Sequence, residues 1–434
     1  MINSFNTEFS KLLNYQDNPK NNFVLGLSGG LDSMVLLYSL KNFIDKFDSH
    51  KIKIFPVIID HNLRSESSDE AKAVQEISKK IGFQTSIKKI VNNKPHGNIQ
   101  DWARRNRRDL LFESCSILSA NLLLAHHFDD QAETLFMRFT KNSGLDGLIG
   151  MKSISFWNGI FILRPFLNFS KNQIYNYAIN NNIKYFEDSS NYLLKYERVR
   201  VRYLLNNIKT NVWKNISKDL NRFGVVSSNL ITKINILFND WIKQNAIIDK
   251  CGGVRLCHDS TRILFEKSDI FCIKFFIKII QTVGGKEYPP KRKQVRHLIN
   301  SLFIMKFKKH TLGNVCVFLK QNYIYFVREQ RNLHFNTEIK KNKKYIFDGR
   351  FIISSSASGT LISSETGNHN NISDKSPFYD YKRLINNTIP CIQTLEGKLI
   401  KPHLKIIDEK TKINTNEIIK PNSFKLYLIN RVLI

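Results

Sequence analysis

A short polar loop between two apolar segments constrains the fold of this chain more than any other feature of its sequence. The loop, residues 28–33, reads Ser-Gly-Gly-Leu-Asp-Ser and lies between the apolar runs 23–27 and 34–37. A strand that turns through two glycines into a helix collects backbone N–H groups at the positive end of the helix dipole. Gly29 and Gly30 allow positive φ and a close approach of the backbone to an anion. The loop therefore predicts a phosphate-binding turn between a strand and a helix.

The side chains of the loop fit the same chemistry. Ser28 and Ser33 offer hydroxyl donors to phosphate oxygens, and Asp32 can hold Mg²⁺ beside them. The Gly-x-x-x-x-Gly-Lys-Ser/Thr pattern of P-loop nucleoside triphosphatases is absent from the sequence, so the loop predicts a different kind of phosphate cradle. An ordinary Ser/Gly turn before a buried helix is the alternative, but such a turn does not require these residue types in this order.

Strand-like and helix-like segments alternate along the first half of the chain. Apolar strand-like runs occupy residues 23–27, 53–59, 85–91 and 121–125. Helical patterns begin at the Ser67–Glu70 capping box, at 99–118, at 130–139 and at the Ser170–Gln173 capping box. This alternation predicts an α/β fold, a Rossmann-like parallel sheet with helices on both faces. Ligands bind beyond the carboxyl ends of such strands, so residues 28–33, 60–61 and 126–127 should meet in one crevice.

The second half of the chain differs from the first in its patterns. A length of 434 residues suffices for roughly two to four domains. We expect domains at 1–205, at 206–335, which is basic and mainly helical, and at 336–434, which is small and mixed α/β. Strand-like alternation lies within 311–328, and the Ser, Gly, Asn and Thr residues of 353–376 predict a loop or linker.

The charge balance favours a polyanionic partner. Lys and Arg outnumber Asp and Glu by 66 to 37, a formal net charge of +29, which favours nucleic acid or an anionic membrane surface. The chain is also rich in Lys, Asn and Ile, so part of the excess reflects composition alone. No apolar stretch reaches the ~20 residues of a membrane span, and no signal peptide is evident. Because the six cysteines are scattered, we expect a reduced, cytoplasmic protein that binds no membrane.

The segment 126–134, His-His-Phe-Asp-Asp-Gln-Ala-Glu-Thr, concentrates groups that can move protons. Asp130 is a candidate N-cap of the helix that follows, and ordinary dipole complementation would explain Asp130 or Glu133. It would not explain the whole cluster. His127, Asp129 or Asp130 can position a nucleophile, take its proton or help to hold Mg²⁺.

Other polar segments suit anionic ligands. Asp60, after the second strand, can contact adenosine or metal, and Arg64 can contact a phosphate; a polar loop before a capped helix is the alternative. Arg104 and Arg107 share one helix face and suit a phosphodiester or the phosphates of ATP. The Arg- and Tyr-rich segment 196–203 can grip an RNA backbone and stack on bases, although a plain charged helix also explains it.

In this order the motifs resemble those of the N-type ATP pyrophosphatases, or PP-loop family, which cleave ATP to AMP and pyrophosphate while activating a carbonyl oxygen. More narrowly, the first 205 residues or so are similar to the tRNA(Ile)-lysidine synthetase family. The matching segments are 28–33, 60–64, 103–107, 126–134, 143–148, 164–167 and 187–191, with shorter matches at 289–291, 311–313 and 328–329. The chain departs from the family at Val199, where Asn is usual, and at Arg108, where Tyr is usual. These departures concern tRNA docking rather than adenylation.

The resemblance implies ATP-dependent ligation of free L-lysine to C2 of the wobble cytidine, position 34, of tRNA(Ile) with a CAU anticodon. An adenylated cytidine would be the intermediate, and AMP and pyrophosphate the other products. The catalytic residues it implies are Asp32, Arg104, Arg107, His127, Asp129 and Asp130. ATP would bind Ser28, Gly29, Gly30, Leu31, Asp32, Ser33 and Asp60, with Mg²⁺ at Asp32. The implied substrate-binding residues are Arg64, Glu133, Arg138, Glu187, Asp188, Asn191, Arg198 and Arg202.

By the same resemblance, residues 206–335 would bind the tRNA body and residues 336–434 its acceptor side. Three alternatives belong to other functional classes. A tRNA thiolation enzyme shares the ATP loop, but it normally uses Cys-x-x-Cys pairs, which this chain lacks. Another ATP-pyrophosphatase ligase would not need the basic C-terminal half, and a non-catalytic RNA-binding protein would leave residues 28–33 unexplained. The sequence is compatible with a monomer or a homodimer.

Overall fold

The chain forms two compact units in the computed structural model, Met1–Ile231 (unit 1) and Thr232–Ile434 (unit 2). The division falls within the 30-residue helix α8, Ile216–Asn245. The division into domains 1–205, 206–335 and 336–434 stays a prediction. The structure describes residues 1–14, 21–47, 51–61, 67–90, 95, 97, 99–141, 143–157, 160–187, 193–249, 252–286, 289–304, 309–331, 333, 336–341, 344–354, 358–363, 378, 384–385, 387–397 and 399–400.

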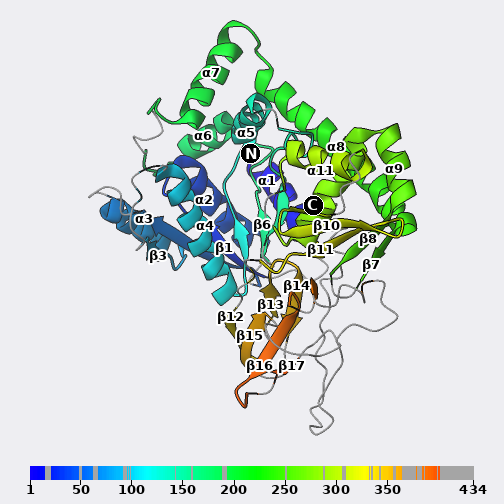
Figure 1. The fold of residues 1–434 in the computed structure, drawn as a ribbon. Coiled ribbons are helices and arrows are strands. Elements are labelled where there is room, and N and C mark those ends of the chain that lie inside the picture. Colours follow the sequence, from blue (N-terminus) through cyan, green and yellow to red (C-terminus); the bar gives the residue numbers. More distant parts are fainter. Residues whose placement is uncertain are drawn as a thin grey trace. The chain divides into compact units, whose positions relative to one another are not determined.

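Unit 1 is built on a six-stranded sheet with the strand order β3-β2-β1-β4-β6-β5 (Figure 1). Its strands are β1 Asn22–Gly26, β2 Lys53–Asp60, β3 Ser86–Lys89, β4 Asn121–Leu123, β5 Ile154–Trp157 and β6 Ile160–Leu163. Its helices are α1 Ile2–Asn14, α2 Leu31–Lys46, α3 Ser67–Ile81, α4 Ile99–Ile117, α5 Phe128–Thr140, α6 Lys171–Asn180 and α7 Glu197–Asn211, followed by α8. All neighbouring strands are parallel except β5 and β6. The predicted fold class is confirmed.

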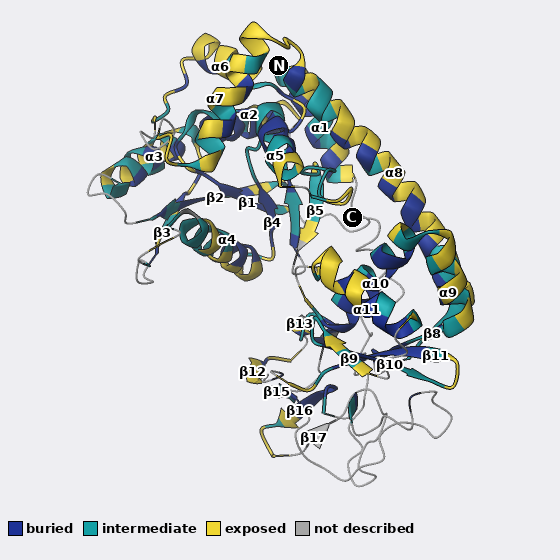
Figure 2. Cartoon of the chain, turned by 45° about the horizontal axis from the view of Figure 1, so that its top comes forward, coloured by how far each residue is buried: buried dark blue, intermediate teal, exposed yellow. Residues whose placement is uncertain are grey.

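The apolar run in β1 is buried on both sides of the sheet (Figure 2). Phe23 and Leu25 point to the face covered by α1, α2, α3 and α6. Val24 points to the opposite face and packs with Leu111 and Phe112 of α4. Successive side chains of a strand alternate between faces, so an unbroken apolar run is expected where helices cover both of them.

The strand order reverses beside β1, because β2 lies on one side of it and β4 on the other. In an open α/β sheet, the loops that leave two such strands run toward opposite faces, and ligands bind between them. The loop after β1 carries residues 28–30, and the loop after β4 carries residues 124–127. The fold thus places the two most polar motifs of the sequence at the expected ligand-binding position.

Unit 2 combines helices with antiparallel sheets. Its helices are α9 His258–Lys267, α10 Asp269–Val283 and α11 Arg292–Phe303. Its strands are β7 Ala246–Ile248, β8 Val254–Cys257, β9 Lys309–Leu312, β10 Val315–Lys320, β11 Tyr323–Arg328, β12 Asn336–Ile339, β13 Lys344–Phe347, β14 Phe351–Ser354, β15 Gly359–Ser363, β16 Pro390–Thr394 and β17 Leu399–Ile400. Helices α10 and α11 pack on the sheet β7-β8-β11-β10-β9. No helix in the described part of the chain is long and apolar enough to cross a membrane.

Two sequence predictions for unit 2 have different outcomes. The strands predicted within 311–328 are confirmed as β10 and β11. The loop or linker predicted at 353–376 is wrong for residues 353–354, which end β14, and for residues 359–363, which form β15 between β12 and β16. Residues 355–357 and 364–376 lie outside the described residues. Every second residue of β15 is buried, so a strand pattern is present there despite the small and polar composition.

Backbone contacts join the end of α10 to the turn between β13 and β14. Gly285 follows α10 with φ +62°, and a Cβ atom at this position would clash with the backbone carbonyl oxygen of Asp348. The Asp348 carboxylate accepts hydrogen bonds from Arg328 Nε at 2.8 Å and from Arg350 Nε at 2.6 Å. Both arginines are buried. These contacts attach the β13–β14 hairpin to β11 and α10 within unit 2.

Candidate active site

The loop between β1 and α2 has the conformation of an anion-binding turn. Gly29 has φ +80°, and a Cβ atom there would lie 2.6 Å from Val74 Cγ2. Gly30 is the N-cap of α2 with φ −73°, so positive φ is used at Gly29 and not at Gly30. The Ser33 hydroxyl donates to Gly30 O and lies 3.0 Å from Ser28 Oγ, which closes the loop. No side chain caps α2, so N–H groups of its first turn stay open to an anion.

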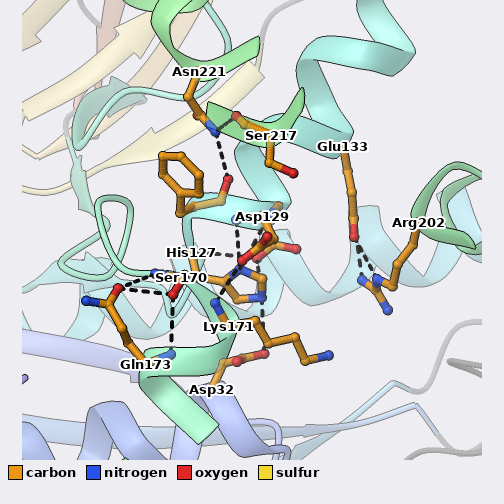
Figure 3. Close-up of polar contacts among 12 residues, drawn as sticks. Asp32, His127, Asp129, Glu133, Ser170, Lys171, Gln173, Arg202, Ser217 and Asn221 are labelled. Atoms are coloured by element: carbon orange, nitrogen blue, oxygen red, sulfur yellow. Dashed lines mark hydrogen bonds and ion pairs between the residues drawn. The ribbon is translucent and has the colours of Figure 1, made fainter. Parts of the chain in front are cut away.

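Asp32 lies in the first turn of α2 with one carboxylate oxygen buried and without a partner. Oδ1 has no hydrogen-bond partner among the residues that the structure describes, and Oδ2 lies 3.7 Å from His127 Nε2 (Figure 3). Burial raises the pKa of Asp32, an effect that His127 opposes and Asp130 reinforces. A cation would supply the missing partner of Oδ1. Mg²⁺ is usually held by one or two carboxylates and by substrate phosphates, and Asp32 fits that role. No group of three or more metal-ligating side chains occurs among the described residues.

His127 caps helix α5 with its imidazole. Nδ1 accepts hydrogen bonds from the backbone N–H groups of Asp129 and Asp130 at 3.2 and 3.3 Å, and the Asp130 carboxylate accepts from His127 N. The prediction that Asp130 is the N-cap is therefore wrong: α5 begins at Phe128, and Asp130 completes the capping box. Because Nδ1 is an acceptor, a neutral His127 carries its proton on Nε2, which faces Asp32 and Asp130.

Asp129 connects the start of α5 to the start of α6. Its Oδ2 accepts a hydrogen bond from the backbone N–H of Lys171 at 2.8 Å (Figure 3). The predicted capping box of α6 is confirmed, with Ser170 as N-cap and Gln173 as its partner. Two capped helices thus hold Asp129 beside His127.

Glu133 is buried between two arginines of α7. Arg198 Nε and Arg202 Nε each donate to its carboxylate at 2.6 Å, and Arg198 Nη2 also donates to Asp130 Oδ1 at 2.8 Å. Burial alone would raise the pKa of Asp130, but His127 and Arg198 lower it. Because Arg198 and Arg202 of α7 both bind Glu133 of α5, they fix α7 against α5, and Arg198 orients Asp130. Arg200 instead donates to the carbonyls of residues 194 and 195.

The four arginines of α4 fall into two pairs. Arg105 is paired with Asp101, and Arg108 with Asp109. Arg104 and Arg107 make no hydrogen bond or ion pair with any residue that the structure describes. The pKa of Arg107 is lowered by burial and by Arg104. An uncompensated pair of guanidinium groups on one helix face is suited to an anionic ligand.

Two more arginines, Arg138 and Arg164, interact electrostatically with Arg104 and form no ion pair with a described residue. Burial and the Arg104 charge lower the pKa of Arg138, and they lower that of Arg164 to about 10. Arg138 donates to the carbonyls of residues 147 and 150, and Arg164 to the Lys152 carbonyl. Burial lowers the pKa of His126 to about 3, so this imidazole is neutral near pH 7, and its buried Nδ1 has no hydrogen-bond partner among the described residues. Arg104, Arg107, Arg138 and Arg164 therefore give this edge of unit 1 positive charge that no described acidic side chain pairs with.

Other predicted site residues are placed differently. Asp60 is buried and accepts hydrogen bonds from the hydroxyls of Ser67 and Ser68, both at 2.7 Å, at the start of α3. Glu187 is exposed, and Leu31 is half-buried at the start of α2. Arg64, Asp188 and Asn191 lie outside the described residues. Arg164 was not predicted as a site residue, because the strand before it, β6, was not recognised. His126 was recognised only as part of its segment.

Comparison with known proteins agrees with this geometry. Residues 1–208 match the PP-loop domain family. A protein of Wolbachia pipientis wMel named tRNA(Ile)-lysidine synthase is 29% identical over 352 residues, 79% of each chain. Its namesake in Orientia tsutsugamushi strain Boryong is 27% identical over 422 residues, 92% of each chain. Among solved structures, the U34-tRNA thiolase NcsA from Methanococcus maripaludis is 18% identical and covers 52% of this chain and 79% of its own, with a TM-score of 0.44.

The open turn before α2, the sheet and the match over residues 1–208 define a PP-loop, ATP-dependent ligase. Along most of its length, the chain is similar to proteins named tRNA(Ile)-lysidine synthase.

Proposed function

We propose that this protein joins free L-lysine to C2 of cytidine 34 in tRNA(Ile) with a CAU anticodon, with ATP cleaved to AMP and pyrophosphate. The observation that carries the proposal is the set of open groups at the reversal of the sheet. Among the described residues, these are the uncapped turn before α2, the Asp32 Oδ1 atom without a hydrogen bond, and Arg104 and Arg107 without an acidic partner. The names of the relatives supply the substrates, which geometry alone does not identify.

In the first step the cytidine C2 oxygen attacks the α-phosphate of ATP, and pyrophosphate leaves. The open N–H groups of α2 bind phosphate oxygens, and Arg104 and Arg107 stabilise the charge that develops on the phosphoryl group. Mg²⁺ held at Asp32 would neutralise phosphate charge as a Lewis acid. The Ser28 hydroxyl and the Ser33 hydroxyl keep the loop closed around this position.

In the second step the lysine ε-amine attacks C2 and expels AMP. The amine has a pKa of ~10.4 in water and must lose a proton to act as a nucleophile. The His127 Nδ1 lone pair is occupied by backbone N–H groups, and Asp130 is bound to Arg198. We therefore propose that Asp129 removes the proton from the amine. Its Oδ2 accepts a hydrogen bond from Lys171 N, and its Oδ1 has no hydrogen bond among the described residues. His127 positions the reacting groups.

The basic C-terminal regions, 206–335 and 336–434, are assigned to the tRNA body and its acceptor side, and the enzyme to the cytoplasm. The net charge of +29 supports a nucleic-acid partner. Binding should weaken steeply with salt, because each neutralised phosphate releases a counterion.

The direct test measures pyrophosphate release from ATP by the full-length protein with a tRNA(Ile) transcript carrying CAU, with and without lysine. Mass spectrometry of the tRNA then locates the added mass. Lysine on cytidine 34 supports the proposal. Pyrophosphate release with a different modification, or no turnover with this tRNA, contradicts it.

A further inference from the structure

A shallow cavity lies where α7 ends and α8 begins, within unit 1. It has a volume of about 640 Å³ and is lined by residues 206 and 209–214, here named the α7–α8 corner. Its polar lining groups are the amides of Asn206 and Asn211, the Thr210 hydroxyl, and two lysines. All these residues are exposed, at the outer end of α7 (Figure 2). The α7–α8 corner is not part of the site described above.

Trp213 presents an aromatic face that the fold holds in place. Its backbone N–H donates to Ile208 O at 2.6 Å, and its indole Nε1 donates to Asp219 Oδ2 at 3.0 Å. The residue is nevertheless 48% exposed. Because the hydrogen bond already fixes the indole, stacking another ring on it costs little conformational entropy. The solvent-exposed face of Trp213 is therefore suited to binding a stacked ring.

The charged residues around Trp213 indicate which class of ligand could stack on it. Lys209 and Lys214 line the cavity, and neither forms an ion pair with a described residue. Asp219, the acidic group in contact with Trp213, is occupied by the indole N–H. Val212 is the other apolar side chain of the lining, which is too little for an apolar protein interface. Unpaired lysines beside an exposed aromatic ring match single-stranded nucleic acid.

The position of the α7–α8 corner links it to the substrate. Arg202 of α7 binds Glu133 near the candidate active site, and Asn211 ends the helix nine residues later. At 1.5 Å per residue, the corner lies about 14 Å farther along the helix axis. An RNA strand with one base in the site can span this distance with its neighbouring nucleotides.

We propose that the α7–α8 corner binds an unpaired nucleotide of the RNA substrate, with its base stacked on Trp213 and its flanking phosphates at Lys209 and Lys214. The inference rests on the proposed function only in that the substrate is an RNA. The α7–α8 corner would be a second contact with the same RNA strand, away from the reacting atoms. This contact would set the affinity for the strand and its position in the site.

The test measures binding of fluorescently labelled tRNA(Ile) transcript by the full-length protein at several stated salt concentrations. Trp213→Ala should weaken binding roughly tenfold, and Trp213→Phe should retain most of the affinity, because phenylalanine can still stack. Lys209→Gln with Lys214→Gln should make the slope of log affinity against log salt shallower by about 0.7 for each lysine. Lys79→Gln with Lys80→Gln, two exposed lysines at the end of α3, is the matched control.

Unchanged affinity and salt slope in both sets of variants would overturn the inference, even if the wild type attaches lysine to tRNA. Loss of RNA binding in these variants, in a protein that transfers no lysine, would support the α7–α8 corner and contradict the proposed function. Light scattering distinguishes another occupant: dimers of the wild type that Trp213→Ala dissociates, without a change in RNA affinity, would assign the corner to a second copy. The lysine variants keep the test valid if Trp213→Ala does not fold.

Discussion

Two charged clusters, one in each unit, differ in how their carboxylates are paired. In unit 2, both Asp348 oxygens accept hydrogen bonds from arginines, at 2.6–3.0 Å. In unit 1, Asp32 Oδ1 is buried without a partner, and Arg104 and Arg107 have no acidic partner among the described residues. A buried charge without compensation costs stability. The Asp348 cluster therefore serves the fold, whereas the unit 1 cluster is the one that we propose binds a ligand.

The largest effect is expected from Asp32→Asn. It should reduce tRNA-dependent pyrophosphate release by roughly a thousandfold or more, because the carboxylate that we propose holds Mg²⁺ beside the ATP phosphates is lost. It should also raise Tm, since a buried charged oxygen without a partner becomes neutral. Activity assays and calorimetry check the two halves. Asp45→Asn, an exposed position on the same helix paired with Lys41, should change neither; a lower Tm for Asp32→Asn would break the comparison.

The opposite outcome is expected for Asp348→Asn. Removing this carboxylate charge leaves two buried arginines without it, so the free energy of unfolding should fall by about 3 kcal/mol. Denaturant titration measures this loss, and the activity per folded molecule should persist. Asp240→Asn, which breaks an exposed pair with Lys243, should cost less than about 1 kcal/mol. Equal losses for the two variants would show that the Asp348 cluster has no special structural role.

Helix α4 allows paired and unpaired charges to be compared within one helix. Arg107→Gln should lower kcat/KM by roughly a hundredfold if its free guanidinium meets phosphate. Arg105→Gln, which already has Asp101 as its partner, should change kcat/KM less than about twofold. Steady-state kinetics with ATP varied at saturating tRNA, and then the reverse, identifies the affected substrate. Equal effects of the two substitutions would contradict the assignment of the unpaired arginines.

The smallest effect concerns pH and His126. Its pKa is about 3 in the folded protein and close to 6.5 in an unfolded chain. Between these values the unfolded state binds more protons, so stability should fall as the pH drops below 6.5. His126→Gln should remove this part of the acid sensitivity, which urea titrations at pH 7 and pH 5 would reveal. An identical pH dependence in both proteins would show that His126 is not held neutral by burial.

Local patterns predicted much of unit 1. Apolar strands, the two-glycine turn and the Ser170–Gln173 capping box depend on neighbours in sequence, and all appear in the structure. The start of α5 was mispredicted because an imidazole rarely serves as an N-cap acceptor. The division of the α4 arginines was not predicted, although both acidic partners are near in sequence: Arg105 pairs with Asp101 one turn earlier, and Arg108 with its neighbour Asp109. Arg164 was not predicted as a site residue, because the short strand that precedes it, β6, was not recognised.

The contact of Gly285 with Asp348 has a consequence for the gene. Every single-base change in a glycine codon that alters the residue introduces a Cβ atom, and at codon 285 that atom has no space. Gly349, with φ +64°, faces Gly285 across the same contact. Surveys of variants of this gene should therefore find only synonymous changes at codons 285 and 349, even where codons for nearby lysines and asparagines vary.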